Sequence, residues 1–159
     1  MSSQKRPNNR TFWYLISTFF YVGYFPVFPG TVTSFVIAVL IYLVYPILPS
    51  PYLEIPLLLL ILFLGVKGSH FIEKDLGKRD PQFIVIDEVA GMMFSVLLIP
   101  KSLPTLLVGL ILFRIFDIWK PWLIDRVQNV PKGWGVMLDD LLAGFAAWIF
   151  NCVFFYCVR

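Results

Sequence analysis

The sequence predicts an all-α membrane protein: a polytopic helical bundle of about five transmembrane helices, plus an N-terminal interfacial or re-entrant segment. Of its 159 residues, 58% are hydrophobic and only 14% are charged, whereas about a quarter of an average soluble domain is charged. So few charges cannot cover a globule of this size with a solvated surface. No linker or low-complexity run divides the chain, so we expect residues 1–159 to form a single domain.

The N-terminal segment, residues 11–28, differs from the other apolar stretches. It is rich in aromatic side chains and is interrupted by Gly23 and Pro26, features that favour a position at the membrane interface over a full crossing. Basic residues precede it, but no small-residue cleavage site follows, so we expect no secretory signal.

Five further stretches are apolar enough to be candidate spans. They are residues 32–48, 52–66, 83–100, 104–118 and 141–158. Several fall short of the roughly 20 residues that a helix needs to cross a bilayer comfortably. Four prolines crowd the first connection, which predicts a tight turn there or short, tilted helices: Pro46, Pro49, Pro51 and Pro56.

The basic residues predict the orientation of these spans. With the N-terminus in the cytoplasm, nearly all of the 13 Lys and Arg residues are cytoplasmic, and only Lys101 and Arg159 lie on the other side. This asymmetry follows the positive-inside rule for five spans, and it is lost if residues 11–28 also cross. The basic residues behind the net charge of +3 lie mostly in the segments between the apolar stretches and not in one basic block, so we expect no nucleic-acid partner.

Three polar blocks fall on the cytoplasmic side of this topology. The first is Pro29-Gly30-Thr31, with Thr33 and Ser34, directly before the first span. A Pro-Gly-Thr turn at a helix start can leave amide N–H groups open to an anion. The alternative is that Thr31 or Thr33 is an ordinary N-cap.

The second block is acidic and runs from His70 through Asp75 and Asp80 to Asp87 and Glu88. Carboxylates this dense repel one another unless a cation lies among them, and hard oxygen ligands suit Mg²⁺. The alternative for Asp75 is a surface ion pair, and for His70, the only histidine, a structural role. Asp87 and Glu88 are embedded in apolar sequence, where ionisable residues are costly and usually functional.

The third block combines Arg114, Asp117 and Lys120 with the later pair Asp139 and Asp140. The first three lie near one face of a helix C-terminus, where cations are favoured. Arg114 and Lys120 suit a phosphate, because a guanidinium binds oxygens in a fork and an ammonium acts as a compact charge. Snorkelling at the interface is the alternative for Lys120.

The two acidic pairs are each followed by a glycine on the same helical face. Asp87 lies four residues before Gly91, and Asp140 lies four residues before Gly144. Both helices start on the cytoplasmic side, where the helix dipole favours carboxylates, and the glycines permit close helix contact. A Gly-Trp-Gly turn at residues 133–135 is expected to deliver the second pair.

Together the blocks favour metal-assisted phosphoryl chemistry, in which carboxylates hold a cation and one of them orients a water. The chain lacks a Cys-x5-Arg cradle, an Asp-x-Asp pair, a second histidine and a Gly-x4-Gly-Lys loop. Attack by water, or by a carboxylate nucleophile, remains. The alternative from another class is a small transporter or channel, since buried carboxylates also mark ion pathways. The gathering of charge at one face disfavours it.

Four motifs resemble those of the phosphatidylglycerophosphatase A family, and they occur in the same order along the chain as in that family. They are Pro29-Gly30-Thr31 with Ser34, Ile86-Asp87-Glu88 with Gly91, the segment 113–122 around Arg114, and the segment 135–144 around Asp139. The resemblance covers about residues 23–144. It implies a magnesium-dependent hydrolase that releases the terminal phosphate of phosphatidylglycerophosphate. It also implies a multi-pass protein of the bacterial cytoplasmic (inner) membrane, with its site on the cytoplasmic side.

The resemblance also implies roles for individual residues. Asp87, Asp117 and Asp140 are expected to be catalytic, Asp80, Glu88 and Asp139 to bind metal, and Thr31, Ser34, Arg114 and Lys120 to contact phosphate, with His70 and Asp75 as further candidates. The division of roles among the carboxylates stays open. There are two departures from the expected pattern: Thr33 stands where a glycine is expected, and Pro131-Lys132 replaces a more glycine-rich segment.

Overall fold

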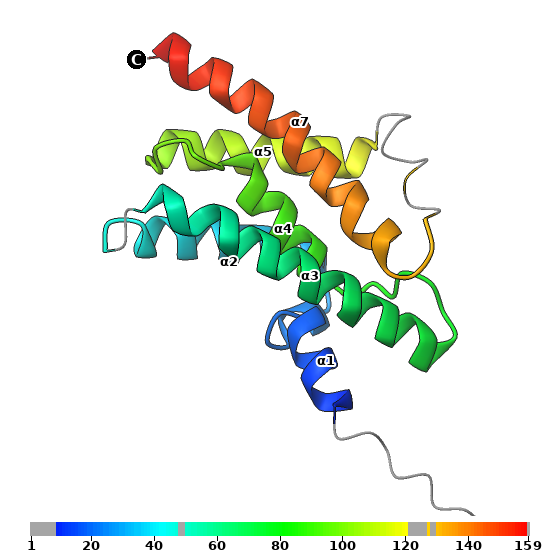
Figure 1. Cartoon of the computed structure of the whole chain (residues 1–159). Coiled ribbons are helices and arrows are strands. Elements are labelled where there is room, and N and C mark those ends of the chain that lie inside the picture. The colour runs from blue at the N-terminus through cyan, green and yellow to red at the C-terminus, as the bar shows by residue number, and fades with distance from the viewer. Residues whose placement is uncertain (1–8, 48–49, 121–126, 128–129, 159) are drawn as a thin grey trace, which may run out of the picture.

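The computed structural model describes residues 9–47, 50–120, 127 and 130–158. This part of the chain forms six α-helices and one 3₁₀ turn (Figure 1): α1 (Arg10–Ser17), η1 (Val22–Tyr24), α2 (Pro29–Val44), α3 (Pro51–Leu76), α4 (Ile86–Ser95), α5 (Leu103–Trp119) and α7 (Trp134–Val158). The predicted all-α class is confirmed. Four charges used to predict topology lie outside the described residues: Lys5, Arg6, Arg126 and Arg159.

Helix α4 is the centre of the bundle, and it packs against α2, α3, α5 and α7 (Figure 1). Its Val89, Ala90 and Met92 side chains are almost fully buried, and they belong to one apolar core with Phe113 of α5 and Met137 of α7. A helix surrounded in this way needs no polar face. The sequence Val-Ala-Gly-Met-Met-Phe directly after Asp87-Glu88 meets that requirement.

Helices α4 and α7 approach each other closely at two glycines. A Cβ atom on Gly144 would collide with the backbone of Gly91, and a Cβ on Gly91 would lie 2.7 Å from the carbonyl oxygen of Asp140. The close contact predicted from these glycines is therefore confirmed. Because Asp87 and Asp140 each precede their glycine by about one helical turn, this crossing brings the two carboxylates together.

Helix α4 is shorter than the predicted span of residues 83–100. It ends at Ser95 after 10 residues, a length of about 15 Å, and irregular backbone follows inside the bundle. Side chains of α7 bind the carbonyl groups that this ending leaves: Asn151 Nδ2 donates to the Ser95 carbonyl oxygen at 3.0 Å, and Trp148 Nε1 donates to that of Leu97 at 2.7 Å. Such partners allow a helix to stop within an apolar environment.

A buried lysine completes this ending. Lys101 Nζ donates to the carbonyl oxygens of Val96 and Ile99 at 2.6 and 2.7 Å, and it forms an ion pair with Glu54 of α3 at 2.9 Å. The Glu54 carboxylate also accepts the N–H of Leu98. The turn after α4 is thus held by side chains from three separate parts of the chain.

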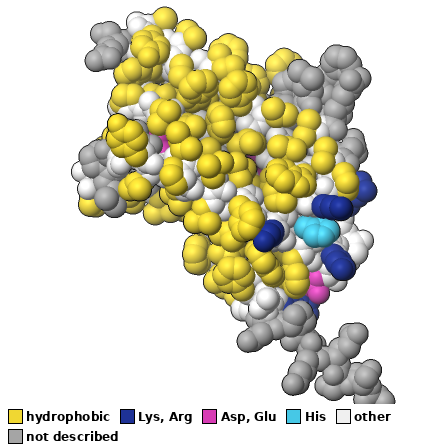
Figure 2. Space-filling view, in the orientation of Figure 1, with side chains coloured by type: hydrophobic (Ala, Val, Ile, Leu, Met, Phe, Trp, Pro, Cys, Tyr) yellow, Lys and Arg dark blue, Asp and Glu magenta, His cyan; other side chains and the backbone are white. Residues whose placement is uncertain are grey.

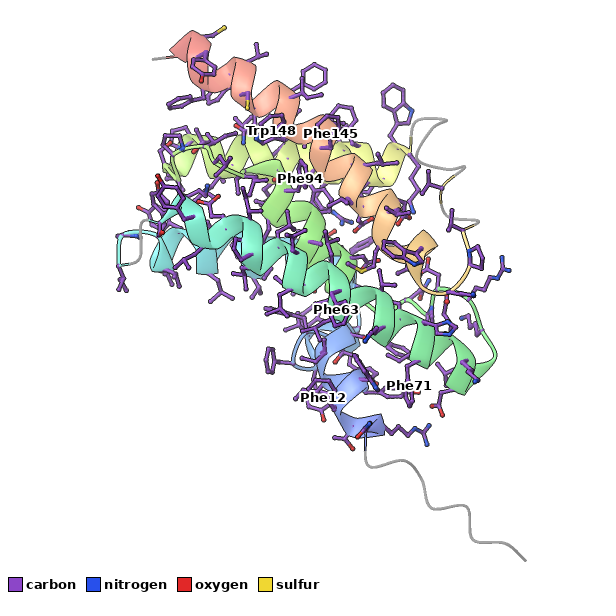
Figure 3. The ribbon with its side chains drawn as sticks, viewed as in Figure 1. Phe12, Phe63, Phe71, Phe94, Phe145 and Trp148 are labelled. Carbon is purple, nitrogen blue, oxygen red and sulfur yellow. The ribbon has the colours of Figure 1, made fainter. Side chains whose placement is uncertain are left out.

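Aromatic side chains seal the same region from the α7 side. Phe94 of α4 meets Phe145 and Trp148 of α7 edge to face, with ring centroids 5.8 and 6.4 Å apart, and Phe145 stacks on Trp148 (Figure 3). Edge-to-face and stacked pairs are favourable arrangements for such rings. They hold the Trp148 indole where it reaches the carbonyl oxygen of Leu97, just after α4.

The outer surface of the bundle is largely apolar. Helix α3 over Tyr52–Leu76 and helix α7 over Trp134–Cys157 are each long and apolar enough to cross a membrane. Figure 2 shows apolar side chains over most of the visible face, with Lys and Arg gathered towards the end of α3. Exposed apolar surface of this extent fits a lipid environment better than water.

Candidate active site

A cavity of about 440 Å³ opens at one end of the bundle, where α2, α4 and α7 begin and α5 ends. Nine of the predicted site residues line it: Thr31, Asp80, Asp87, Glu88, Arg114, Asp117, Lys120, Asp139 and Asp140. We call it the acidic cavity. Residues separated by more than one hundred positions thus meet in one place, while their individual roles stay predictions.

Three carboxylates form the centre of the acidic cavity. Asp87, Glu88 and Asp140 each offer an oxygen, and these oxygens lie within 4.8 Å of one another. One oxygen of each carboxylate is buried and has no hydrogen-bond partner among the described residues. Buried like charges this close repel strongly unless a cation lies between them. The triad is therefore suited to hold a metal ion, and oxygen ligands suit a hard cation.

The three carboxylates that meet in the structure are not the three that the resemblance implies as metal ligands. Glu88 belongs to both the expected metal set and the triad, but Asp87 and Asp140, expected to be catalytic, are its other members. Asp80 and Asp139, expected to bind metal, line the same cavity outside this group. The geometry makes Asp87 and Asp140 candidates for both roles.

Two ion pairs place the cations of the cavity. Arg114 Nη1 lies 2.7 Å from Asp117 Oδ2 within α5, and Lys120 Nζ lies 2.8 Å from Asp139 Oδ2 across to α7. Within the described part of the chain, Arg114 Nε is buried and has no hydrogen-bond partner. Arg114 therefore keeps a donor for a further oxygen ligand.

The start of α2 forms the opposite wall. The N-cap is Phe28, with no capping side chain, and Thr33 Oγ1 instead donates to the Pro29 carbonyl oxygen at 2.9 Å. The alternative that Thr31 or Thr33 caps this helix is therefore wrong. First-turn amides have no acceptor within their own helix, and here Gly30 and Thr31 both line the cavity.

Three residues of the wall have left-handed backbone. Phe28, Asp80 and Lys120 have φ angles of 49°, 44° and 41°, values that non-glycine residues rarely adopt and that often occur at functional sites. Desolvation in the loop raises the pKa of Asp80, and the negative charge of Asp139 raises it further. These residues stand where α2 begins, where the loop before α4 turns, and where α5 ends.

The structure does not bring the other three predicted site residues into the cavity. The Ser34 hydroxyl is buried and donates to the Gly30 carbonyl oxygen at 2.8 Å. Asp75 forms an ion pair with Arg10 at 2.9 Å and accepts the Tyr14 hydroxyl at 2.8 Å, which ties α1 to α3. This is the structural alternative considered for Asp75, although its partners are on α1.

His70 lines a neighbouring cavity of about 550 Å³. Basic residues of the α3 end and of the segment before α7 surround this second cavity, including Lys74, Lys78 and Lys132. Asp80 and Asp139 line both cavities. His70 therefore lies outside the acidic cavity, in a neighbouring cavity that shares Asp80 and Asp139 with it.

Two features of the site were not expected from the sequence. Gln82 lines the acidic cavity, and a lone amide in a loop carries no pattern that distinguishes it. The expected Gly-Trp-Gly turn is only partly correct: Gly133 has φ 74°, but α7 already begins at Trp134, and Gly135 is helical. Asp139 and Asp140 therefore lie within α7, about a turn and a half from its start.

Comparison with known proteins identifies a matching family. The profile of the phosphatidylglycerophosphatase A family matches residues 15–155. Phosphatidylglycerophosphatase A of Escherichia coli (strain K12) is 37% identical over 136 residues, which cover 83% of this chain and 77% of that protein. The Haemophilus influenzae protein of the same name is 36% identical over 85 residues, 50% of this chain and 52% of its own.

A third relative carries a different name. A Bacteroides thetaiotaomicron protein, named as a candidate phosphatidylinositol-3-phosphatase, is 33% identical over 145 residues, 87% of this chain and 91% of its own. No solved structure matches the chain. The profile match covers most of the chain and includes all four motifs that carried the resemblance. The chain belongs to the phosphatidylglycerophosphatase A family.

Proposed function

We propose that this protein hydrolyses phosphatidylglycerophosphate to phosphatidylglycerol and inorganic phosphate. The observation that carries the proposal is the meeting of the Asp87, Glu88 and Asp140 carboxylates with Arg114 and Lys120 in one cavity, in a chain of this family. Carboxylates suit a cation, and the basic side chains suit phosphate oxygens. The apolar outer surface of the bundle supports a position of this site beside lipid.

We infer that the chain crosses the bilayer five times and that the acidic cavity faces the cytoplasm of a bacterial cell. The crossings are α2, α3, α4 with the irregular residues after it, α5 and α7, while α1 and η1 lie at the interface. Support comes from the length of α3 and α7 and from the satisfied ending of α4. The basic side chains near the cavity favour the cytoplasmic side.

We infer that the resident cation is Mg²⁺. The unpartnered carboxylate oxygens of Asp87, Glu88 and Asp140 fit a hard divalent ion, and Mg²⁺ commonly combines one or two carboxylates with phosphate oxygens and water. When bound, such an ion supplies charge stabilisation to the phosphoryl oxygens in the transition state.

The other polar groups of the cavity then bind and orient the substrate phosphate. In this proposal Arg114, which is ion-paired with Asp117, and Lys120, which is ion-paired with Asp139, bind the terminal phosphate. The first-turn amides of α2 offer further donors at a positive helix end. These contacts align the phosphorus for in-line attack and neutralise its developing negative charge.

The reaction itself needs one water molecule. Its oxygen bonds to phosphorus, and a carboxylate of the cavity, Asp87, Asp117 or Asp140, accepts the proton that this water loses. The ester bond between phosphorus and the glycerol oxygen breaks, and that oxygen takes up a proton. Inorganic phosphate leaves, and phosphatidylglycerol remains in the membrane.

A phosphoinositide is the second candidate substrate, because the Bacteroides thetaiotaomicron relative is named for one. Both lipids present a phosphate monoester on a polar headgroup. The transporter alternative has less support: the acidic cavity and the Glu54–Lys101 pair involve different parts of the bundle, and an apolar core containing Met92 and Phe113 fills its centre.

Phosphate release by the purified full chain tests the proposed function. Phosphatidylglycerophosphate and phosphatidylinositol 3-phosphate are compared in detergent micelles, with Mg²⁺ or with EDTA, for wild type, Asp87→Asn and the matched control Asp75→Asn. We expect Mg²⁺-dependent release from phosphatidylglycerophosphate that Asp87→Asn abolishes and Asp75→Asn retains. No release by wild type from this lipid with any divalent metal would contradict the proposal.

A further inference from the structure

An apolar groove of about 890 Å³ runs along the outside of the bundle between the first half of α2 and the second half of α5. Its walls include Val32 and Phe35 of α2 and Leu110, Ile111 and Ile115 of α5. Phe35, Ile111 and Ile115 are 57%, 56% and 48% exposed, so the groove is open to the side of the bundle. We call it the lateral groove.

The lateral groove meets the acidic cavity at two shared residues. Thr31 and Arg114 line both, and among the described residues that line the groove they alone carry a hydroxyl group or a charge. A molecule in the groove therefore has apolar contacts along α2 and α5 and also reaches Arg114, which lines the acidic cavity together with the carboxylate triad. Only an amphipathic ligand with an anionic end matches both parts.

We propose that the lateral groove binds an acyl chain of the phospholipid substrate while its terminal phosphate lies in the acidic cavity. The inference rests on the proposed function, and its occupant follows from continuity: the groove and the acidic cavity share Thr31 and Arg114, two residues expected to contact phosphate. Burial of apolar surface supplies affinity along the chain, and Arg114 fixes the anionic end. The substrate thus enters laterally from the lipid, without leaving the bilayer.

This arrangement assigns a specificity role to α2 and α5. A headgroup without acyl chains makes only the polar contacts and loses the apolar ones, so remote binding would contribute less to holding the phosphate in line. The protein is therefore expected to prefer a membrane lipid over a soluble phosphate monoester that carries the same headgroup.

Photocrosslinking tests the groove without requiring hydrolysis. Phosphatidylglycerophosphate carrying a diazirine in one acyl chain is bound to the full-length protein in nanodiscs, in EDTA, and labelled peptides are identified by mass spectrometry. Labelling concentrated on residues 32–35 and 110–118, and displaced by unlabelled substrate, supports the proposal. Even labelling of all lipid-facing helices, or labelling that the substrate does not displace, means ordinary surrounding lipid and overturns it. A second copy of the chain cross-linked at the groove also overturns it.

Steady-state kinetics of groove variants provide a second test of the proposal. Ile111→Trp and Ile115→Trp fill the groove, and Ile149→Trp, at an exposed position of α7 outside it, is the matched control. We expect the groove variants to lower kcat/KM for the long-chain lipid about tenfold, the effect of roughly two methylene groups losing apolar contact. Hydrolysis of the deacylated headgroup should stay unchanged in all three variants.

The outcomes separate the two proposals. If wild type hydrolyses the lipid but the groove variants match Ile149→Trp, the groove assignment is wrong and the proposed function stands. If wild type hydrolyses neither the lipid nor its headgroup, the proposed function fails, and crosslinking alone decides whether the groove binds a lipid chain.

Discussion

Gly30 of α2 lies against Glu88 of α4 so closely that a Cβ atom at position 30 would collide with the Glu88 carboxylate oxygen Oε1. The absence of a side chain at Gly30 is therefore what lets Glu88 reach into the triad. The relationship ties the first turn of α2 to Glu88, fifty-eight positions after Gly30, and it makes Gly30 a determinant of the inferred metal site without being a ligand.

Gly30→Ala is expected to weaken metal affinity about 10- to 100-fold, the usual effect of disturbing a group that orients a metal ligand. Isothermal titration of the purified protein with Mg²⁺ or Mn²⁺ measures it. Gly109→Ala is the matched control. Its Cβ atom would also crowd a side chain, that of Val96, but neither Gly109 nor Val96 lines the acidic cavity. Unchanged metal affinity in Gly30→Ala would contradict the inferred position of Glu88.

Metal removal is expected to destabilise the wild type, because the carboxylates of the triad then repel one another in a buried site. At a metal concentration of about 100 times Kd, binding adds roughly 2.7 kcal/mol to the free energy of unfolding. Thermal unfolding in detergent, with Mg²⁺ and with EDTA, measures this difference.

Asp140→Asn should change that response in a specific way. Its unfolding temperature in EDTA should equal or exceed that of wild type, since one buried charge is removed, and Mg²⁺ should no longer raise it. A variant that Mg²⁺ stabilises as strongly as wild type would show that Asp140 is not part of the metal site.

Arg114→Lys should lower kcat/KM by about 10- to 100-fold, since an ammonium cannot make two parallel contacts to phosphate oxygens. The matched control is Arg10→Lys, which makes the same change in the ion pair with Asp75, away from the cavity. Steady-state phosphate release from the lipid measures both. Equal activity of the two variants would exclude a forked phosphate contact by Arg114.

Lys101→Met should destabilise the protein by about 3–5 kcal/mol, because it leaves the Glu54 carboxylate and two backbone carbonyl groups without their buried donor. Chemical unfolding in detergent measures the loss, and activity per folded molecule should stay near wild type. Replacing both partners, in Glu54→Leu with Lys101→Met, should restore part of the stability. A double variant no more stable than Lys101→Met would contradict this account.

The inferred orientation can be tested by cysteine labelling in intact cells and in inverted vesicles. After Cys152→Ala and Cys157→Ala, the substitutions Lys78→Cys and Lys132→Cys should react with an impermeant reagent only in inverted vesicles, and Leu103→Cys only in intact cells. Labelling of positions 78 and 132 from opposite sides would contradict the shared cytoplasmic face.

Each of the five stretches that were expected to span the membrane contains a helix in the structure. They could be predicted because long apolar runs, and the prolines and charges beside them, are local features of the sequence. The bounds differ from the prediction at α3, which continues to Leu76, at α7, which already begins at Trp134, and at α4, which ends at Ser95 and not near residue 100. Apolar sequence continues past this point, so hydropathy does not reveal the end. The helix can stop there because Asn151 and Lys101, distant in sequence, bind the carbonyl groups that it leaves.

For the candidate site, the sequence by itself determined the residue types, their gathering at helix ends and the family, because each depends on spacing along the chain. Only the tertiary structure decided which of these residues meet. The crossing at Gly91 and Gly144 joins Asp87 to Asp140, whereas Asp75 turns to Arg10. Such choices depend on how closely two helices approach, and that distance is set by packing across the whole bundle.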